Sequence, residues 1–101
     1  MFIRIGQVAE VGEGSMRVFD VDGSKVNVSR TAGGLYGIDD TCTHLRCSLA
    51  NGRLEGTTVT CACHGSQFDV TSGAVLRGPA QSPVRSWAVE VRGDELFAEV
   101  R

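Results

Sequence analysis

The segments CTHLRC, residues Cys42 to Cys47, and CACHGSQFD, residues Cys61 to Asp69, decide how this chain folds. Between them they hold all four cysteines and both histidines of the 101 residues. Each segment offers cysteine and histidine together, and sixteen residues separate His44 from Cys61. Two loops of this composition can hold one object from two sides, so the rest of the chain has to bring the loops together.

Three uses of these six side chains are open: four ligands of a metal centre with two cysteines to spare, two disulfides, or a zinc site. Single histidines are usually solvated and free cysteines usually fill small apolar spaces, but that does not explain six such residues in two loops. Zinc fingers usually place a cysteine pair and a histidine pair on separate elements. Here each loop offers both types, which favours two metals side by side, one bound by thiolates and one by imidazoles.

Length and charge restrict the class of protein. A chain of 101 residues is the length of one domain, and its net charge of −2 comes without a basic stripe for nucleic acid or anionic lipid. The opening MFIRIGQVAEV lacks the apolar core of a signal peptide, and no apolar run is long enough for a membrane span. We therefore expect a cytoplasmic monomer without nucleic-acid or membrane partners. Because the cytoplasm keeps thiols reduced, four cysteines favour metal binding over a disulfide scaffold.

Short alternating runs on both sides of the cysteine-rich middle predict β-strands. Residues 16–21 and 25–30 flank the turn dipeptide Asp22-Gly23, which predicts a hairpin. A second hairpin is predicted from residues 86–91 and 96–100 around Gly93-Asp94. No window has helical periodicity, so helix is limited to a turn or two near residues 7–11. The predicted fold class is all-β, with an irregular middle between the hairpins.

The two segments resemble the cluster-binding boxes of Rieske iron-sulfur proteins, in which Cys-x-His is followed after a similar gap by Cys-x-x-His. The resemblance covers most of the chain. It implies a single Rieske domain of residues 1–101, with an antiparallel β-sandwich base domain and a small cluster-binding subdomain at about residues 41–83. It also implies one Rieske-type 2Fe-2S cluster, in which Cys42 and Cys61 bind one iron and His44 and His64 bind the other. Two thiolates and two neutral imidazoles make such a cluster easier to reduce than four thiolates do.

The resemblance gives the remaining cysteines a definite role. High-potential Rieske proteins of cytochrome complexes have cysteines at the positions of Cys47 and Cys63, where they form a disulfide between the two loops. Most soluble Rieske ferredoxins lack this pair. The resemblance therefore implies a disulfide here, which would stabilise the loops by about 3 kcal/mol on the chain-entropy estimate. The alternative is two reduced, buried thiols.

Further residues are implied to act on the cluster. Gly65 would let the backbone approach it, and the segment containing Gly78 and Pro79 would keep water from one of its faces. Ser66 matches the family position whose hydroxyl donates a hydrogen bond to a cluster sulfide. Phe68 stands where high-potential members have a tyrosine that bonds a ligand sulfur, and phenylalanine cannot donate. The combination predicts a reduction potential between the extremes of the family.

The function implied by the resemblance is one-electron transfer, and the chain is expected not to be an enzyme. We expect a soluble Rieske-type ferredoxin that accepts an electron from a flavin- or NAD(P)H-dependent reductase and passes it to a terminal oxygenase of the aromatic-ring-hydroxylating kind. No pairing of a nucleophile with a base is evident in the sequence. Two alternatives remain: the small subunit of an assimilatory nitrite reductase, and a detached Rieske domain of a cytochrome complex or an oxygenase.

Overall fold

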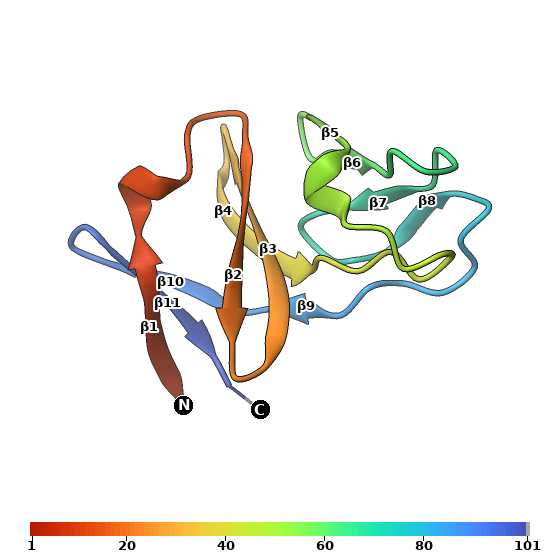
Figure 1. Cartoon of the computed structure of the whole chain (residues 1–101). Coiled ribbons are helices and arrows are strands. Elements are labelled where there is room, and N and C mark those ends of the chain that lie inside the picture. Colours follow the sequence, from red (N-terminus) through yellow and green to blue (C-terminus); the bar gives the residue numbers. More distant parts are fainter. Residues whose placement is uncertain (101) are drawn as a thin grey trace.

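Antiparallel strands account for most of the regular structure in the computed structural model, which describes residues 1–100 (Figure 1). The strands are β1 (Phe2–Gln7), β2 (Met16–Val21), β3 (Ser24–Thr31), β4 (Gly34–Asp39), β5 (Arg53–Glu55), β6 (Thr58–Thr60), β7 (Gln67–Asp69), β8 (Val75–Arg77), β9 (Ser86–Trp87), β10 (Val89–Arg92) and β11 (Glu95–Glu99). Short 3-10 helices occur at η1 (Val8–Glu10) and η2 (Leu49–Asn51). The all-β prediction is confirmed, and Arg101, the last residue of the expected domain, lies outside the described residues.

Two of the three sheets form the base of the molecule. Their strand orders are β1-β11-β10 and β2-β3-β4-β9. Both sheets bury side chains in one common core, made of Val11, Phe19, Val21, Val26, Val28, Trp87, Leu96 and Ala98. Sheets that share an apolar core between their inner faces form a β-sandwich. The expected sandwich base is therefore present, and it contains both chain termini of the described part (Figure 1).

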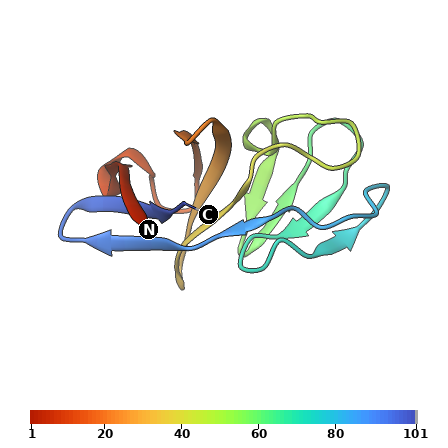
Figure 2. The ribbon, with the colours of Figure 1, turned by 90° about the horizontal axis from the view of Figure 1, so that it is seen from below.

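The third sheet, with strand order β5-β6-β7-β8, stands beside the base at the end away from the termini (Figure 1, Figure 2). Each of its strands has only three residues. The prediction of an irregular middle was wrong on this point, because alternation over three residues is too short to recognise in a sequence. The sheet has a second core of Ile38, Cys42, Leu49, Val59, Cys61, Phe68, Val70, Ala80 and Val84.

The first predicted hairpin is confirmed. Strands β2 and β3 pair from Met16↔Ser29 to Val21↔Ser24. Asp22 and Gly23 make the turn with φ of 50° and 83°. Two successive residues with positive φ are what a type I′ turn requires, and its twist matches that of the strands. The helical turn expected near residues 7–11 is also present, as η1.

The second predicted hairpin needs a correction. Strands β10 and β11 pair as expected, but Ser86 and Trp87 form a separate strand, β9, which pairs with β4 of the other sheet. The chain thus passes from one sheet of the sandwich to the other within the predicted strand. Gly37 lies opposite Trp87, and a Cβ at Gly37 would lie 2.8 Å from the Val89 Cγ2 and 3.2 Å from the Trp87 Cβ. The missing side chain at Gly37 makes room for this crossing, which sequence periodicity could not reveal.

Gly73 fixes the return of the chain from the third sheet toward the base. The Val84 N–H donates to the Gly73 carbonyl at 3.0 Å. Gly73 has a φ of 85°, and a Cβ there would lie 2.0 Å from the Val84 carbonyl oxygen. The position therefore combines a left-handed backbone with a close approach of two backbone segments, both of which favour glycine.

We expect Gly73→Ala to destabilise the protein more than Gly56→Ala does. Gly56 also has positive φ, 60°, but a Cβ there would meet nothing within 4 Å. Both substitutions add left-handed strain, and only the first adds overlap, worth about 1–3 kcal/mol. The thermal midpoint of Gly73→Ala should therefore lie roughly 4–20 °C below that of Gly56→Ala. Equal midpoints for the two variants would show that residues 73 and 84 separate without loss of stability.

Candidate metal centre

Two loops of the same backbone design carry all four predicted ligands. We call residues 42–47 the first ligand loop and residues 61–66 the second ligand loop. In each, the N–H of the first residue donates to the carbonyl of the sixth, and the N–H of the fifth donates to the carbonyl of the first. These bonds join Cys42 with Cys47 and Arg46 at 2.8 and 2.9 Å, and Cys61 with Ser66 and Gly65 at 2.8 and 3.1 Å. The fifth residues, Arg46 and Gly65, have φ of 61° and 79°.

The first residues of the loops, Cys42 and Cys61, are buried free thiols with 1% and 4% of their surface exposed. Burial raises the pKa of the Cys61 thiol, and the neighbouring Cys42 side chain raises it as well, whereas backbone N–H groups of Cys63 and His64 lower it. The two side chains therefore lie close together, and the surroundings of Cys61 disfavour its bare thiolate. A coordinated metal ion supplies the positive charge that such a pair of thiolates needs.

The histidines lie on the solvent side of these cysteines. Both His44 and His64 are exposed. Their rings meet edge to face, with 5.3 Å between the ring centroids and 87° between the ring planes. Sulfur donors thus face the interior and nitrogen donors face outward, which is the division that a group with two metals and two ligand types requires.

The spacing of the four side chains is too wide for one zinc ion. Among residues 1–100, the only group of three or more potential ligands whose atoms lie within 4.8 Å of one another is Cys47, Cys61 and Cys63. No three of the four predicted ligands come that close together, whereas the donors of a tetrahedral zinc ion lie about 3.3–3.8 Å apart. The donor set therefore fits a two-metal group better than a single ion.

A disulfide joins the two ligand loops. It links Cys47 to Cys63 across a Cα–Cα distance of 6.5 Å, as the resemblance implied. The Cys61 Sγ lies within 4.8 Å of both disulfide sulfurs, so the bridge packs directly beside a predicted ligand. Cys47 is half-buried and Cys63 is exposed. The bridge therefore ties the loops together at a place that solvent reaches.

A third segment, residues 78–82, is hydrogen-bonded to both ligand loops. The Ala80 N–H donates to the Ser66 hydroxyl at 3.0 Å, and the Thr43 hydroxyl donates to the Ser82 carbonyl at 2.6 Å. Ser66 is 1% exposed. Its oxygen accepts the bond from Ala80, and within residues 1–100 its own proton has no hydrogen-bond acceptor. A buried hydroxyl with a free proton beside the thiols suits the predicted bond to a cluster sulfide.

The remaining predicted residues fall in different surroundings. Pro79 and His44 line a common hollow of about 420 Å³ between the first ligand loop and residues 78–82. Pro79 therefore lies beside a predicted ligand of the metal centre. Gly78 directly precedes Pro79. Position 65 favours glycine because of its positive φ and not for lack of space, since a Cβ there would meet nothing within 4 Å. Phe68 is fully buried in the core of the third sheet, opposite Val59.

Sequence reasoning missed Asp40, a buried carboxylate at the base of the first ligand loop. One of its oxygens accepts from Asn27 Nδ2 at 3.1 Å and from the Ala50 N–H at 2.9 Å, and the other accepts from the Ser48 hydroxyl. Asp40 is 4% exposed and Asn27 is fully buried. The carboxylate thus holds the segment after the loop against strand β3. The polar Asn27 between Val26 and Val28 was the one signal that could have revealed it.

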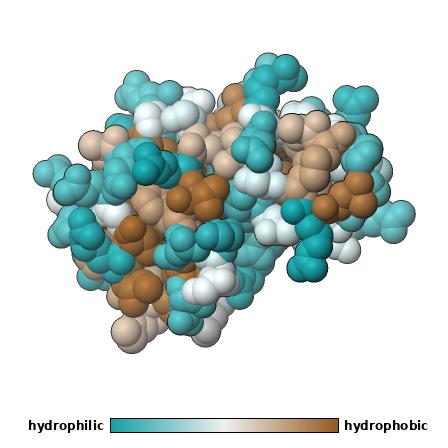
Figure 3. Space-filling view, viewed as in Figure 1, coloured by the Kyte–Doolittle hydropathy of each residue, from teal (hydrophilic) through white to brown (hydrophobic). Residues whose placement is uncertain are grey.

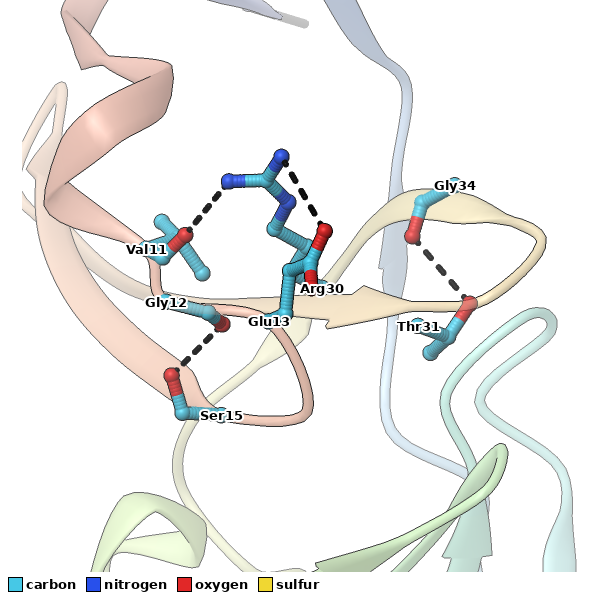
Figure 4. Close-up of polar contacts among 7 residues, drawn as sticks. All are labelled: Val11, Gly12, Glu13, Ser15, Arg30, Thr31 and Gly34. Carbon is cyan, nitrogen blue, oxygen red and sulfur yellow. Dashed lines mark hydrogen bonds and ion pairs between the residues drawn. The ribbon is translucent and has the colours of Figure 1, made fainter.

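A hollow larger than the one beside His44 lies elsewhere, at the base. It has about 810 Å³ and is lined by Glu13, Gly14 and residues 30–35. Figure 4 shows Arg30 donating to the Val11 carbonyl at 3.1 Å and paired with Glu13 at 4.0 Å. The Ser15 hydroxyl bonds the Gly12 carbonyl in the same view. The lining contains neither cysteine nor histidine, so this hollow is separate from the metal centre.

Comparison with known proteins identifies the family. A family model described as the Rieske 2Fe-2S domain matches residues 1–88. The chain belongs to the Rieske family. The family and its ferredoxin relatives indicate one Rieske-type 2Fe-2S cluster and the role of an electron carrier. Within residues 1–100, no helix is long and apolar enough to span a membrane.

Individual Rieske relatives are ferredoxins of oxygenase systems. The ferredoxin component of the p-cumate 2,3-dioxygenase system of Pseudomonas putida is 34% identical over 93 residues, covering 90% of this chain and 79% of that protein. The ferredoxin of carbazole 1,9a-dioxygenase from Nocardioides aromaticivorans superposes with a TM-score of 0.94 at 30% identity, covering 100% of this chain and 99% of that one. A ferredoxin solved in complex with its oxygenase, in carbazole 1,9a-dioxygenase, gives 0.88 at 28% identity, with 96% and 91% covered.

The disulfide can be tested by alkylation of the oxidised Rieske protein. Because Cys47 and Cys63 are bridged, iodoacetamide should modify neither of them in the native holoprotein, although Cys63 is exposed. After denaturation and loss of the cluster, Cys42 and Cys61 alone should be modified, and a reductant should add two further sites. Alkylation of Cys63 without reductant would show that the loops are not bridged in the purified protein.

Proposed function

We propose that this Rieske ferredoxin takes one electron from a flavin- or NAD(P)H-dependent reductase and passes it to a terminal oxygenase of the aromatic-ring-hydroxylating kind. One observation carries the proposal: two exposed imidazoles, His44 and His64, stand together over two buried thiols. Ferredoxin components of dioxygenase systems are among the relatives, and one such ferredoxin is known in complex with its oxygenase.

In this proposal Cys42 and Cys61 bind one iron, and His44 and His64 bind the other. When bound, the cluster supplies a one-electron couple whose potential is higher than that of four-cysteine clusters. The protein contributes the placement: the buried cysteines would hold the group next to the core of the third sheet, and the exposed histidines would bind it on the solvent side. A partner protein can then approach the ring edges without any movement of the loops.

The supporting residues act on the same centre. The Ser66 hydroxyl would donate a hydrogen bond to a cluster sulfide, and Gly65 gives the second ligand loop its left-handed turn. Gly78 and Pro79 belong to the segment that is bonded to both ligand loops and keeps water from one face. We also propose that the protein is a cytoplasmic monomer. Residues 1–101 would form one domain, with the cluster-binding subdomain at about residues 41–83.

The disulfide favours a second candidate, a Rieske domain of the cytochrome-complex type. In that case the potential would lie near the upper end of the family's range, roughly +300 mV. Phe68 in place of a hydrogen-bonding tyrosine argues for a lower value. The small subunit of a nitrite reductase is the less favoured alternative, because such subunits often lack the ligands and this chain has all four.

The function is tested by reconstitution. The purified chain should be red-brown, contain about two irons and two acid-labile sulfides, and show an EPR signal only after reduction. With an NADH-dependent reductase and a terminal oxygenase of a dioxygenase system, product should form only when the chain is added. His64→Cys is the control for the role of the histidines. A third thiolate should still bind a cluster, but the potential of that cluster should be lower than in the wild-type protein. A colourless chain with one zinc, or turnover that does not need the chain, would refute the proposal.

The potential should respond in opposite directions to two substitutions. A donor to the cluster stabilises the reduced state more than the oxidised one, so Ser66→Ala should lower the potential. Phe68→Tyr should raise it if the new hydroxyl reaches a ligand sulfur. A charged hydrogen bond is worth roughly 1.5–3 kcal/mol in total, and the difference between redox states corresponds to tens of millivolts.

Protein-film voltammetry of the three proteins at one pH measures these shifts. Ser72→Ala is a matched control, because Ser72 is exposed and its hydroxyl accepts a bond from the Ala74 N–H far from the ligand loops. An unchanged potential in Ser66→Ala, with the cluster intact, would mean that the hydroxyl does not face a sulfide.

A further inference from the structure

Almost every cationic side chain in residues 1–100 has an anionic partner within 4.0 Å. The pairs are Arg4–Glu95, Arg17–Glu10, Lys25–Asp20, Arg30–Glu13, Arg53–Glu55, Arg85–Asp39 and Arg92–Glu90. In that part of the chain, two arginines are left without an ion pair, Arg46 and Arg77. A guanidinium that has no partner within its own chain keeps its charge available for a partner molecule.

Both of these arginines lie beside the metal centre. Arg46 belongs to the first ligand loop and follows His44 by two residues. Arg77 is the last residue of β8, directly before Gly78, and it lies opposite Gln67, which follows the second ligand loop. The two free cations therefore flank the ligand loops on the end of the molecule away from the termini (Figure 1, Figure 2).

Each free arginine follows an exposed leucine. Leu45 is 53% exposed and Leu76 is 54% exposed, and only two other large hydrophobic residues, Met1 and Val91, are similarly exposed within residues 1–100. Figure 3 shows hydrophobic and hydrophilic side chains side by side at this end of the molecule. Exposed leucine next to free arginine is a composition typical of protein contact surfaces, which combine apolar centres with arginine.

Acidic residues, unlike the two free arginines, are absent from the segments around the metal centre. The ligand loops and residues 78–82 contain no acidic residue. Within residues 1–100, four carboxylates have no ion pair. Asp22 and Asp94 lie in turns of the base, Asp40 is buried beneath the first ligand loop, and Asp69 in β7 accepts hydrogen bonds from Thr71. The β10–β11 turn with Asp94 lies at the end of the molecule opposite the ligand loops (Figure 2). A protein with a net charge of −2 thus presents a positive end where its electron leaves.

The backbone gives independent support at Arg46. It has a φ of 61°, in the region that glycine adopts easily and other residues do not. The equivalent fifth position of the second ligand loop is Gly65. Glycine would therefore serve the loop geometry equally well in the first loop. An arginine in this strained position is explained by its side chain, which the fold itself does not use.

We infer that Leu45-Arg46 and Leu76-Arg77 form the docking surface for the electron acceptor and select a terminal oxygenase whose electron-entry site is acidic around an apolar centre. The identity of the acceptor rests on the proposed function, whereas the positive charge at the exit does not. The charge distribution attracts an acidic acceptor to the ligand-loop end and repels it from the remainder of the protein. Encounters are therefore oriented with the histidines toward the partner.

Small charged oxidants test the charge at the exit without any partner protein. The reduced holoprotein is mixed in a stopped-flow instrument with ferricyanide, an anion, or with hexaamminecobalt(III), a cation, over a range of salt concentrations. Each oxidant takes one electron from the reduced cluster. The rate with ferricyanide should fall as salt increases and the rate with the cobalt complex should rise. The net charge alone predicts the opposite signs, so the opposite result would overturn the inference.

A pair of double variants separates local charge from net charge. Arg46→Gln with Arg77→Gln should reduce the ferricyanide rate about tenfold at low salt, which is the lower end of electrostatic steering effects, and should reverse its salt dependence. Arg17→Gln with Arg92→Gln makes the same change in net charge on strands β2 and β10 of the base, and should leave the sign of the salt dependence unchanged. Iron content and potential, measured for each variant, correct for differences in driving force.

The terminal oxygenase is tested in the second arm. Reduction of a purified oxygenase by the wild-type ferredoxin should slow with salt, and Arg46→Gln with Arg77→Gln should slow it about tenfold at low salt. Leu45→Ser with Leu76→Ser should weaken the complex at all salt concentrations. If the arginine variants slow only the reductase step, the surface belongs to the reductase and the assignment is wrong. If the ferricyanide rates behave as expected but the wild-type protein does not support oxygenase turnover, the proposed function is refuted instead.

Discussion

The burial of Cys42 and Cys61 side by side in one hydrophobic core is the constraint on which the rest of the structure depends. Burial raises the pKa of the Cys61 thiol, and the neighbouring Cys42 side chain raises it further. The core around them must therefore be held together until a metal supplies positive charge. Phe68 and Val59 fill that core from the three-residue strands of the third sheet.

Three crosslinks of different chemistry keep the ligand loops in place around these thiols. The disulfide between Cys47 and Cys63 is covalent, and residues 78–82 are bonded to both loops. Asp40 holds Ser48 and Ala50, which follow the first loop, to strand β3. The histidines carry none of these links and can remain exposed, which is what a site for electron exchange with another protein needs.

The base contributes position and charge. Its sandwich places the ligand loops at one end of a molecule with principal extents of 38 × 27 × 18 Å, far from the turn that contains Asp94. Within residues 1–100, ion pairs neutralise the arginines of the base, whereas Arg46 and Arg77 beside the ligand loops have no ion pair. A charge difference between the two ends gives the protein a preferred direction of approach to a charged partner. Neither the base nor the ligand loops would produce this orientation alone.

The sequence by itself determined the all-β class and the Asp22-Gly23 hairpin, because these depend on short alternating runs and local turn chemistry. It also predicts the ligand set, from the spacing of rare residue types. It could not determine the third sheet, whose strands are too short for alternation to be visible. Nor could it show that residues 86–91 change sheets opposite Gly37, or that Asp40 is buried against Asn27. The free charge of Arg46 and Arg77 was equally hidden, since the nine bases of residues 1–100 look alike until folding pairs the other seven. Those features arise from contacts between residues far apart in the chain, and only the tertiary structure decides such contacts.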